Sequence, residues 1–483
     1  MLGKLLRQLT GNVAPVPRDA REMEELAAFL RSRVHPLLRD GQVGDALVAL
    51  SPRLAEGAPT RAARNLVEFS IRGIAGLAQT LEWRADLAYL LGTVLLSLDD
   101  SEGAELCASI AWEEPGSRFR RFERGASIVD YARAAGSPAL MLPQLDVARM
   151  DGRPAPLPAM PQSFLCALDG GQVIGESFLP VSADDIVFTE RCTDAPVKLA
   201  RFDGLQWLDM LRMASETALW AAEGPVDDYA GEHVLLGNHE NIGHWLLYFF
   251  SRLRVIEAAA GAAGGALERA KVGVGESVKP LHLDCLARAG IDASRIVRIP
   301  KGRYARFERL WVPSMPCGVS GNEVIYWAPG TIADIRRRLG VMAPRGGGKR
   351  RVFLSRRGAR WRRLANEDAI AAVLARRGFE EVDAGKLTLA EQIALGAEVG
   401  AMVGCFGAGM NLQLFLGEGV PIVQLQIEQR VRMNIHVPIA GELDQPFHPV
   451  VGEVTTRHAD PLKSDFAVKP ARILEALDRA GVR

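Results

Sequence analysis

The chain has 483 residues, and its composition excludes several classes of protein. Hydrophobic residues make up 48% and charged residues 24%, values typical of a globular protein and not of a disordered one. Lys and Arg together number 58, as do Asp and Glu, so no overall charge favours nucleic acid as a partner. A domain usually holds roughly 100–200 residues, so the length predicts two or three domains.

The cysteines and the apolar runs bear on the cellular compartment. The six cysteines are scattered without a C-x-x-C pair, which indicates buried thiols in a reducing compartment, not a zinc site or a disulfide framework. No stretch reaches the roughly 18 apolar residues of a membrane span. The N-terminal apolar run is too short for a signal peptide. The sequence therefore predicts a cytoplasmic protein, with the inner face of the membrane as the alternative location.

Residues 1–150 are predicted to form a helical N-terminal region. Up to about residue 137, apolar residues recur at spacings of three and four, and Gly and Pro interrupt them. The Pro-rich residues 152–162 follow and are typical of an extended linker. The short runs FLCAL, QVIGESFL and IVFTE then predict a small β layer at the edge of the next domain.

From about residue 197, strand-like and helix-like runs alternate, which predicts parallel sheets covered by helices. Residues 151–343 form the first such domain, in which residues 207–224 are predicted to be a helix. The three glycines at 346–348 indicate a hinge or linker. Residues 344–483 form the second domain. The fold class is therefore α/β, and two such domains suit a ligand bound in a cleft between them.

The first candidate site lies in residues 400–415. A buried strand runs into Gly407, Ala408 and Gly409, and an amphipathic helix is predicted from about Met410. Small residues let a phosphate approach the backbone, and a helix N-terminus offers unpaired N–H groups and a favourable dipole. Many α/β proteins use such a turn only for tight packing, so both interpretations stand.

The second candidate site is a basic tract from 345 to 363, which contains no acidic residue. Most of its side chains are expected to form a solvated face, or at most a membrane-surface patch. Arg356 differs, because it follows Ser355 at the end of the strand VFLSR, where α/β folds place ligand contacts. Its guanidinium is a candidate for neutralising a diphosphate.

Two helix starts near this tract also allow two interpretations. Asn366 and Glu367 open the helix after the tract, either as ordinary capping residues or as site residues. Glu391 lies three residues after Thr388, which is the spacing of a capping box. The capping interpretation is favoured for Glu391.

The third candidate site lies in residues 237–253, where His239, Glu240, Asn241 and His244 crowd the turn between a strand and an amphipathic helix. A histidine titrates near neutral pH, so this turn suits a general base. Ordinary polar contacts at a helix start are the alternative. A metal site is discounted, because no third ligand stands at a sensible spacing.

Taken together and in this order, these stretches resemble the family 61 glycosyltransferases, which include plant xylosyltransferases and animal O-linked N-acetylglucosaminyltransferases. The resemblance covers roughly residues 230–426, and the order and spacing of the motifs carry it. In chain order the matching residues are Asn241, His244, Trp245, Leu246, Ser355, Arg356, Arg362 or Arg363, Asn366, Glu367, Gly378, Phe379, Leu387, Glu391, Gln392, Gly407, Ala408, Gly409, Met410 and Phe415.

The chain departs from the family pattern at one place. Phe406 stands where the family has a histidine, and Asn411 comes one residue before the family's asparagine position. If the family histidine contacts the donor, that hydrogen bond is absent here. Phe406 could instead stack on a base or sugar face.

The resemblance implies an inverting hexosyl- or pentosyltransferase with a GT-B-like pair of Rossmann-like domains, preceded here by the helical N-terminal region. A nucleotide-sugar donor would bind the C-terminal domain, and a glycan or polysaccharide acceptor the first α/β domain. Surface or capsular polysaccharide synthesis is the expected setting. A base deprotonates the acceptor hydroxyl, and positive charge with helix N–H groups stabilises the leaving nucleoside diphosphate.

The resemblance also implies roles for particular residues. His244 is the first candidate for the base, and Glu240 the second. Asn241, Trp245 and His239 would lie on the acceptor side. The diphosphate would be held by Arg356, Arg363 and the turn from Gly407 to Gly409. The remaining residues expected on the donor side are Ser355, Asn366, Glu367, Gln392, Phe406, Ala408 and Asn411.

The implied partners are a nucleotide sugar and a glycan acceptor, with no metal, no other cofactor and no nucleic acid. Peripheral membrane contact and a homodimer stay open. The alternative function is a non-catalytic binding or scaffold protein related to glycosyltransferases, which the phenylalanine at 406 motivates. An NAD-dependent dehydrogenase is disfavoured, because VGVGES lacks the full G-x-G-x-x-G motif.

Overall fold

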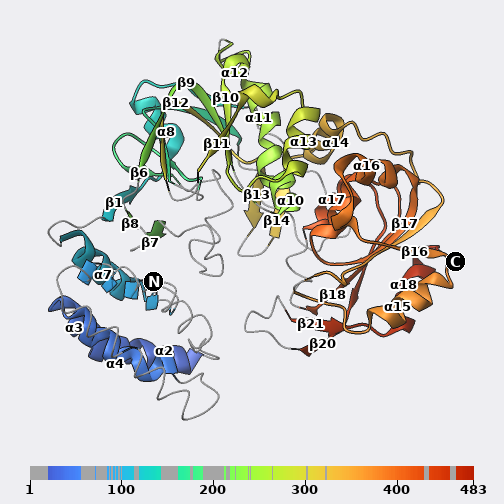
Figure 1. The fold of residues 1–483 in the computed structure, drawn as a ribbon, viewed down its shortest axis with the longest axis horizontal. Helices are drawn as coiled ribbons and strands as arrows, with labels where there is room; N and C mark the ends of the chain where they lie inside the picture. Colours follow the sequence, from blue (N-terminus) through green and yellow to red (C-terminus); the bar gives the residue numbers. More distant parts are fainter. Residues whose placement is uncertain are drawn as a thin grey trace. The chain divides into compact units, whose positions relative to one another are not determined.

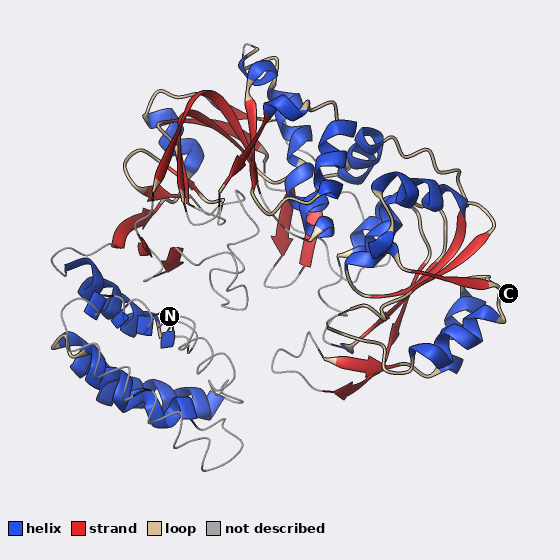
Figure 2. Cartoon of the chain, in the orientation of Figure 1, coloured by secondary structure: helices blue, strands red, loops and turns tan. Residues whose placement is uncertain are grey.

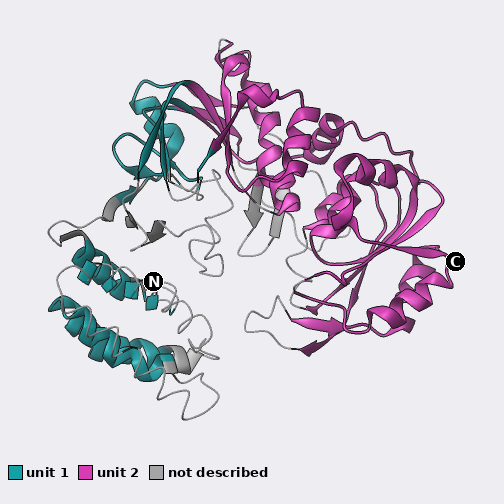
Figure 3. Ribbon diagram, in the orientation of Figure 1, with its two compact units in different colours: residues 1–137, 168–231, 299–310 teal, residues 138–167, 232–298, 311–483 magenta. Residues whose placement is uncertain are grey.

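The structure is a computed structural model, shown as ribbons in Figures 1 and 2. Two compact units are distinguished by colour in Figure 3: residues 1–137, 168–231 and 299–310, and residues 138–167, 232–298 and 311–483. The structure describes residues 20–55, 71, 84–85, 87–88, 91–92, 94–95, 98, 100–113, 119–142, 162–174, 178–188, 211–213, 218–222, 225–237, 239, 241–263, 265–300, 303–320, 324–359, 361–428, 435–456 and 464–483.

The first unit begins with helices, as the apolar spacing predicts. They are α2 Ala20–Phe29, η1 Leu30–Val34, α3 His35–Arg39, α4 Val43–Ala55 and α7 Ser101–Glu113. Buried apolar side chains from these helices form one cluster, which includes Leu30, Leu47 and Ala108. The helix α8, Ile128–Ala134, follows and is capped by the Ser127 hydroxyl, which accepts from the backbone N–H of Asp130.

Three segments of this unit are strands where the sequence pattern predicts helix. They are β1 Phe119–Arg124, β7 Leu211–Met213 and β8 Ala218–Ala222, of which the last two lie in the predicted helix 207–224. β8 pairs antiparallel with both β1 and β7. The helix prediction is wrong here because apolar spacing carries no information on pairing partners, and pairing between segments distant in sequence decides a strand.

The strand-like runs after the Pro-rich stretch do form strands. They are β3 Phe164–Asp169, β4 Gln172–Ile174, β5 Pro180–Val181 and β6 Ile186–Val187. β4, β5 and β6 pair antiparallel in that order, and β6 pairs parallel with β1. β4 also pairs antiparallel with the first residues of β12, Tyr304–Pro313. The result is a layer of short, mixed strands.

The second unit opens with alternating strands and helices. Its strands include β2 Ala139–Met141, the end of β9 Val226–Gly237, β10 Lys271–Gly275 and β11 Ile296–Ile299, and β9 pairs parallel with β10. Between the last three strands run α10 Ile242–His244, the π-helix η4 Trp245–Phe250, α11 Arg252–Ala259, α12 Ala266–Arg269, α13 Pro280–Arg288 and η5 Ala293–Arg295. The alternation is that of an α/β fold, although β2 and β3 pair antiparallel. The GT-B pairing of two Rossmann-like domains stays a prediction.

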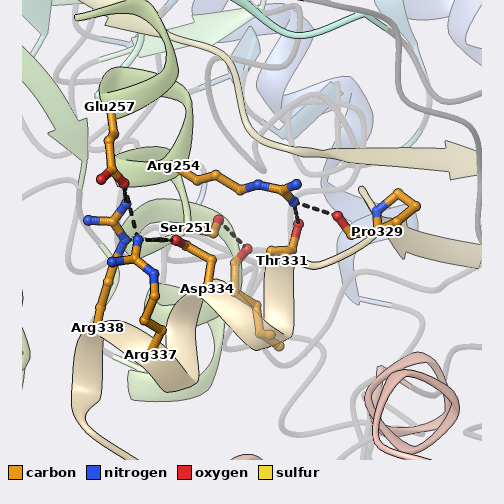
Figure 4. Close-up of polar contacts among 9 residues, drawn as sticks. Ser251, Arg254, Glu257, Pro329, Thr331, Asp334, Arg337 and Arg338 are labelled. Carbon is orange, nitrogen blue, oxygen red and sulfur yellow. Dashed lines mark hydrogen bonds and ion pairs between the residues drawn. The ribbon is translucent and has the colours of Figure 1, made fainter.

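A hairpin and a helix follow in the same unit. The hairpin consists of β13 Cys317–Ser320 and β14 Val324–Trp327, and the helix is α14 Thr331–Leu339. Arg254 on α11 donates to the carbonyl of Pro329 over 2.6 Å and to the Thr331 hydroxyl over 3.3 Å (Figure 4). Glu257 on α11 accepts from Arg337 and Arg338 of α14, as Figure 4 also shows. These contacts hold both the start and the end of α14 against α11.

The C-terminal residues form a five-stranded parallel sheet. Its strands are β15 Arg350–Leu354, β16 Phe379–Val382, β17 Val399–Cys405, β18 Ile422–Gln426 and β19 Phe447–Val451. They lie in the order β16-β15-β17-β18-β19, and all neighbours pair in parallel. In chain order this is 2-1-3-4-5, one of the two common orders of doubly wound sheets. The parallel sheet predicted for this part of the chain is confirmed.

Buried side chains cover both faces of this sheet. Val352 and Met402 pack in one cluster with side chains of α16 Leu389–Glu398 and α17 His436–Glu442. Phe353 and Val403, each one residue further on, pack in another with α15 Glu367–Ala375 and α18 Pro470–Arg479. Helices therefore lie on both faces (Figure 1), because successive residues of a strand point to opposite sides. The remaining elements are η6 Ala384–Lys386, η7 Ala408–Phe415 and the hairpin β20 Glu453–Thr456 and β21 Asp465–Ala467.

Two of the glycines at 346–348, Gly347 and Gly348, are closely packed against the start of β17, whereas a Cβ on Gly346 would meet nothing within 4 Å. Gly347 has a φ of 71°, and a Cβ there would overlap the carbonyl oxygen of Val399. A Cβ on Gly348 would overlap the carbonyl oxygen of Glu398, and the Gly348 N–H donates to Val399 over 3.1 Å. Close backbone approach therefore accounts for glycine at 347 and 348, and the hinge stays a prediction.

The described cysteines agree with the expectation of buried free thiols. They are Cys107, Cys166, Cys285, Cys317 and Cys405, and Cys192 lies outside the described residues. Burial raises the pKa of the Cys405 thiol to about 12, so this thiol stays protonated. In the described part of the chain, no helix combines the length and the apolar character needed to cross a membrane.

Candidate functional site

The carboxyl ends of β15 and β17 form the topological switch point of the parallel sheet. The chain continues from β15 to β16 on one side, whereas β17 lies on the other side of β15. The loops leaving β15 and β17 therefore diverge, and doubly wound proteins bind ligands in the crevice between such loops. Ser355 and Arg356 follow β15, and Phe406 and Gly407 follow β17. Four of the predicted donor-side residues thus lie at this edge.

Arg356 lies directly over Gly407. A Cβ at position 407 would overlap Nη1 of Arg356 and would lie 3.3 Å from its Cζ. Gly407 also has a φ of 153° and a ψ of −175°, a backbone region that only glycine commonly occupies. Arg356 itself donates from Nε to the carbonyl of Arg362 over 3.2 Å and from Nη2 to that of Trp361 over 2.7 Å. Glycine at 407 is therefore required for the arginine to lie there.

Glu367 holds the turn that carries Arg356. It is 6% exposed, and its carboxylate accepts from the Ser355 hydroxyl over 2.9 Å and from the Arg356 N–H over 2.8 Å. Asn366 makes no side-chain cap, and instead exchanges two hydrogen bonds with the backbone of Val468. Neither residue is an ordinary cap, because both side chains fix a loop at the carboxyl edge of the sheet.

Acidic partners pair with four of the eight described basic side chains of the tract. Arg350 pairs with Glu380 and Glu398, Arg357 pairs with Glu381 and Asp368, and Arg345 lies 3.5 Å from Asp444. Arg363 is 62% exposed, and its guanidinium and N–H contact both carboxylate oxygens of Asp465. Arg356 instead donates to backbone carbonyls. Half of the described tract is therefore engaged in ion pairs, and Arg360 lies outside the described residues.

Arg362, and not its neighbour Arg363, reaches the turn at Gly407. Nη2 of Arg362 lies 3.7 Å from the position of a Cβ on Gly407. Its Cζ lies 5.4 Å from the ring centroid of Phe406, within the range of a cation–π contact. Arg362 has a φ of 55°, a left-handed conformation that is uncommon for residues other than glycine. Two guanidinium groups thus converge on one glycine.

His436 completes this corner of the site from α17. Its ring meets Phe406 edge to face, with centroids 5.4 Å apart and an interplanar angle of 77°. Burial, followed by the nearby charges of His244 and Arg362, lowers the pKa of His436 to about 3, so the ring is neutral at physiological pH. Sequence reasoning missed this residue, because it is an isolated histidine outside every motif.

The turn after Gly407 is open on one side and packed on the other. Ala408 is exposed, and a Cβ on Gly409 would meet nothing within 4 Å. The helix predicted from about Met410 starts at Ala408 and is the 3₁₀-helix η7. Asn411 is buried, donates to the carbonyl of Ala408 over 2.7 Å, and packs against Gly243, where a Cβ would overlap its amide. Asn411 therefore joins η7 to α10.

The histidine turn lies beside this contact. His239 and His244 stack with centroids 4.6 Å apart and planes 14° from parallel. Nδ1 of His239 accepts from the Asn241 N–H over 2.9 Å, and the Asn241 side chain accepts from the Gly243 N–H over 2.9 Å. Asn241 thus caps α10, and the neutral form of His239 carries its proton on Nε2. Glu240 lies outside the described residues.

A buried histidine, His282, forms a hydrogen bond with the backbone of this turn. Nδ1 of His282 accepts from the Lys279 N–H, so its Nε2 donates to the carbonyl of His239 over 3.1 Å. Burial lowers the pKa of His282 to about 4, which keeps the ring neutral. Trp245 packs edge to face on this ring and is fully buried. The structure therefore places Trp245, predicted on the acceptor side, in the core.

The polar side chains of the Leu387–Gln392 motif form hydrogen bonds with neighbouring residues in the chain. Thr388 and Glu391 form a capping box, which confirms the capping interpretation of Glu391. Nε2 of Gln392 donates to the carbonyls of Ala384 and Leu387 over 3.3 and 3.1 Å. Gln392 therefore fixes the loop before α16. Within the described ranges, no group of three or more His, Cys, Asp or Glu side chains is arranged to hold a metal ion.

The fold and the site define the class of the domain: it is a doubly wound α/β sheet with two guanidinium groups and a glycine turn at its switch point. The glycosyltransferase 61 family model matches residues 242–423, from the start of α10 into β18. This match confirms the resemblance seen in the sequence and supports a glycosyltransferase domain in this part of the chain. Comparison with curated proteins gives no match.

Proposed function

We propose that the protein is an inverting glycosyltransferase that moves a sugar from a nucleotide-sugar donor to a glycan or polysaccharide acceptor. The observation that carries the proposal is the placement of Arg356 over Gly407 at the switch point of the sheet. Glycine lets a phosphate approach the backbone, and a guanidinium binds phosphate oxygens in pairs. Surface or capsular polysaccharide synthesis in the cytoplasm, with or without contact to the membrane face, is the setting we propose.

The charge at this site suits a leaving nucleoside diphosphate. Negative charge grows on the diphosphate as its bond to the anomeric carbon breaks, and groups already aimed at it lower the barrier. Arg356 is fixed by two backbone carbonyls, and Glu367 fixes the backbone that carries it. Arg362 adds a second guanidinium 3.7 Å from the Cβ position of Gly407. These groups do the work for which other transferases use a metal ion, and no cofactor is needed in this scheme.

His244 is the base in this proposal. The acceptor hydroxyl gives its proton to His244 while its oxygen bonds to the anomeric carbon, and the carbon–phosphate oxygen bond breaks on the opposite side. His239 is less suited, because its Nδ1 already accepts from the Asn241 N–H and its Nε2 carries the proton. The stacked ring of His239 orients His244 instead. One displacement of this kind inverts the anomeric centre.

Nucleotide released from a panel of nucleotide sugars with glycan acceptors tests the proposal. Arg356→Ala removes the charge at the turn, and we expect affinity for the nucleoside diphosphate to fall by about 10- to 100-fold, the value of a charged hydrogen bond. Arg357→Ala is the matched control, because Arg357 is adjacent but pairs with Glu381 and Asp368. The affinity of the Arg357→Ala variant for the nucleoside diphosphate is expected to stay within about twofold of wild type.

The outcomes separate the two functions that the sequence allows. Turnover with one donor supports the transferase. Nucleotide binding without turnover on any donor and acceptor overturns it and favours the binding or scaffold protein. The absence of both binding and turnover refutes the nucleotide site itself.

A further inference from the structure

We infer that Phe406 is a positioning residue whose ring holds the guanidinium of Arg362 beside the glycine turn, making Arg362 the second diphosphate-binding cation. The inference rests on the proposed function, because it concerns the same diphosphate site. It assigns a purpose to a residue at which the chain departs from its family pattern.

The backbone at Arg362 is the first observation. Its φ of 55° costs free energy for a residue with a Cβ, and such conformations persist where surrounding contacts hold them. The same residue receives a hydrogen bond from Nε of Arg356 on its carbonyl oxygen. The strained conformation therefore sends the carbonyl of Arg362 to one arginine and its side chain over Phe406. Arg363, next in the chain, is directed to Asp465.

The surroundings of the Phe406 ring are the second observation. Phe406 is 8% exposed and His436 is 1% exposed, so both rings are buried. His436 packs edge to face on Phe406, and Arg362 lies over the phenyl ring at 5.4 Å. A buried phenyl ring thus presents a fixed surface to the guanidinium. Stacking of Phe406 on a nucleobase or sugar is disfavoured, because these two neighbours cover it.

The chemistry explains why a phenyl ring suits this position. An aromatic face attracts a cation without accepting its in-plane N–H hydrogen bonds, so the ring itself does not compete with phosphate oxygens for Arg362. A carboxylate at 406 would pair with the guanidinium and compete with the ligand. An imidazole would repel it when protonated. Phe406 therefore orients the guanidinium of Arg362 without adding a negative charge of its own.

A double-mutant cycle on binding tests the inference. The probes are UDP, GDP and inorganic pyrophosphate, and calorimetry gives their dissociation constants for the full chain. Phe406→Leu is expected to weaken binding by about 5- to 30-fold, the range of a partly desolvated cation–π contact. Phe406→Tyr keeps an aromatic face and is expected to stay within about twofold of wild type. In an Arg362→Met background, Phe406→Leu is expected to change binding by less than about twofold.

Phe379→Leu is the matched control for loss of a buried aromatic ring. Phe379 is 5% exposed and packs in the cluster on the α15 side of the same sheet. Its replacement lowers stability and is expected to leave the dissociation constants unchanged. If Phe406→Leu fails to fold, Phe406→Met replaces it in the cycle, because methionine fills a similar volume without an aromatic face.

The outcomes distinguish this inference from the proposed function. If the wild type binds none of the probes, the proposed function fails and the inference fails with it. If the wild type binds and Arg356→Ala weakens binding, the diphosphate site of the proposed function stands, and turnover tests the transfer reaction separately. An equal effect of Phe406→Leu in the wild-type and Arg362→Met backgrounds would then overturn the inference alone, because the ring would act only through packing.

Discussion

Gly407 offers the sharpest test of the site, because two independent constraints meet there. Its φ and ψ lie in a region that costs other residues about 1–3 kcal/mol. A Cβ would also overlap Nη1 of Arg356 and displace its guanidinium from the carbonyls of Trp361 and Arg362. Gly407→Ala is therefore expected to lower the Tm by about 2–4 °C for each kcal/mol lost and to weaken nucleoside diphosphate binding by about 10-fold or more.

Thermal unfolding and calorimetric titration with UDP measure the two effects. Gly409→Ala is the control for stability, because a Cβ at 409 meets nothing within 4 Å. In an Arg356→Ala background the overlap is absent, so Gly407→Ala should cost only the backbone strain. A Gly407→Ala protein with wild-type Tm and affinity would refute the reasoning. An equal loss of stability in both backgrounds would refute the overlap with Arg356 specifically.

Two further predictions concern stability. Gly347→Ala is expected to lower the Tm clearly more than Gly346→Ala. Both glycines have a positive φ, near 70–76°, but only a Cβ on Gly347 would meet the Val399 carbonyl. Equal losses of Tm in the two variants would contradict the packing described. His436 binds a proton in the unfolded chain below pH 6.5 but in the folded protein only near pH 3, so stability falls as the pH drops through this window. The slope approaches about 1.4 kcal/mol per pH unit, and His436→Gln is expected to reduce the loss of Tm between pH 7 and pH 5; an unchanged loss would show that another group is responsible.

The C-terminal sheet and its turn are predictable from the sequence. Its strands are short apolar runs separated by helices with clear start signals. A strand that is buried on both faces of a sheet has apolar side chains at successive positions, so its sequence is a nearly continuous apolar run. Local rules also predict the Thr388–Glu391 capping box, which spans one helical turn. These features depend on neighbours in the chain, so sequence reasoning reaches them. The resemblance that rests on them is the one the family model confirms.

Contacts between segments far apart in the chain decided the rest. β7 and β8 are strands because β8 pairs with β1, about 100 residues earlier, which no apolar spacing reveals. Arg362 and Arg363 are chemically identical in sequence, and only the positive φ of Arg362 and the position of Asp465 determine which one reaches Gly407. His436 reaches Phe406 because α17 packs beside η7. The sequence by itself determined the strand ends and the glycine turn, since those are local. Only the tertiary structure decided which charges converge there, because that depends on packing across the sheet.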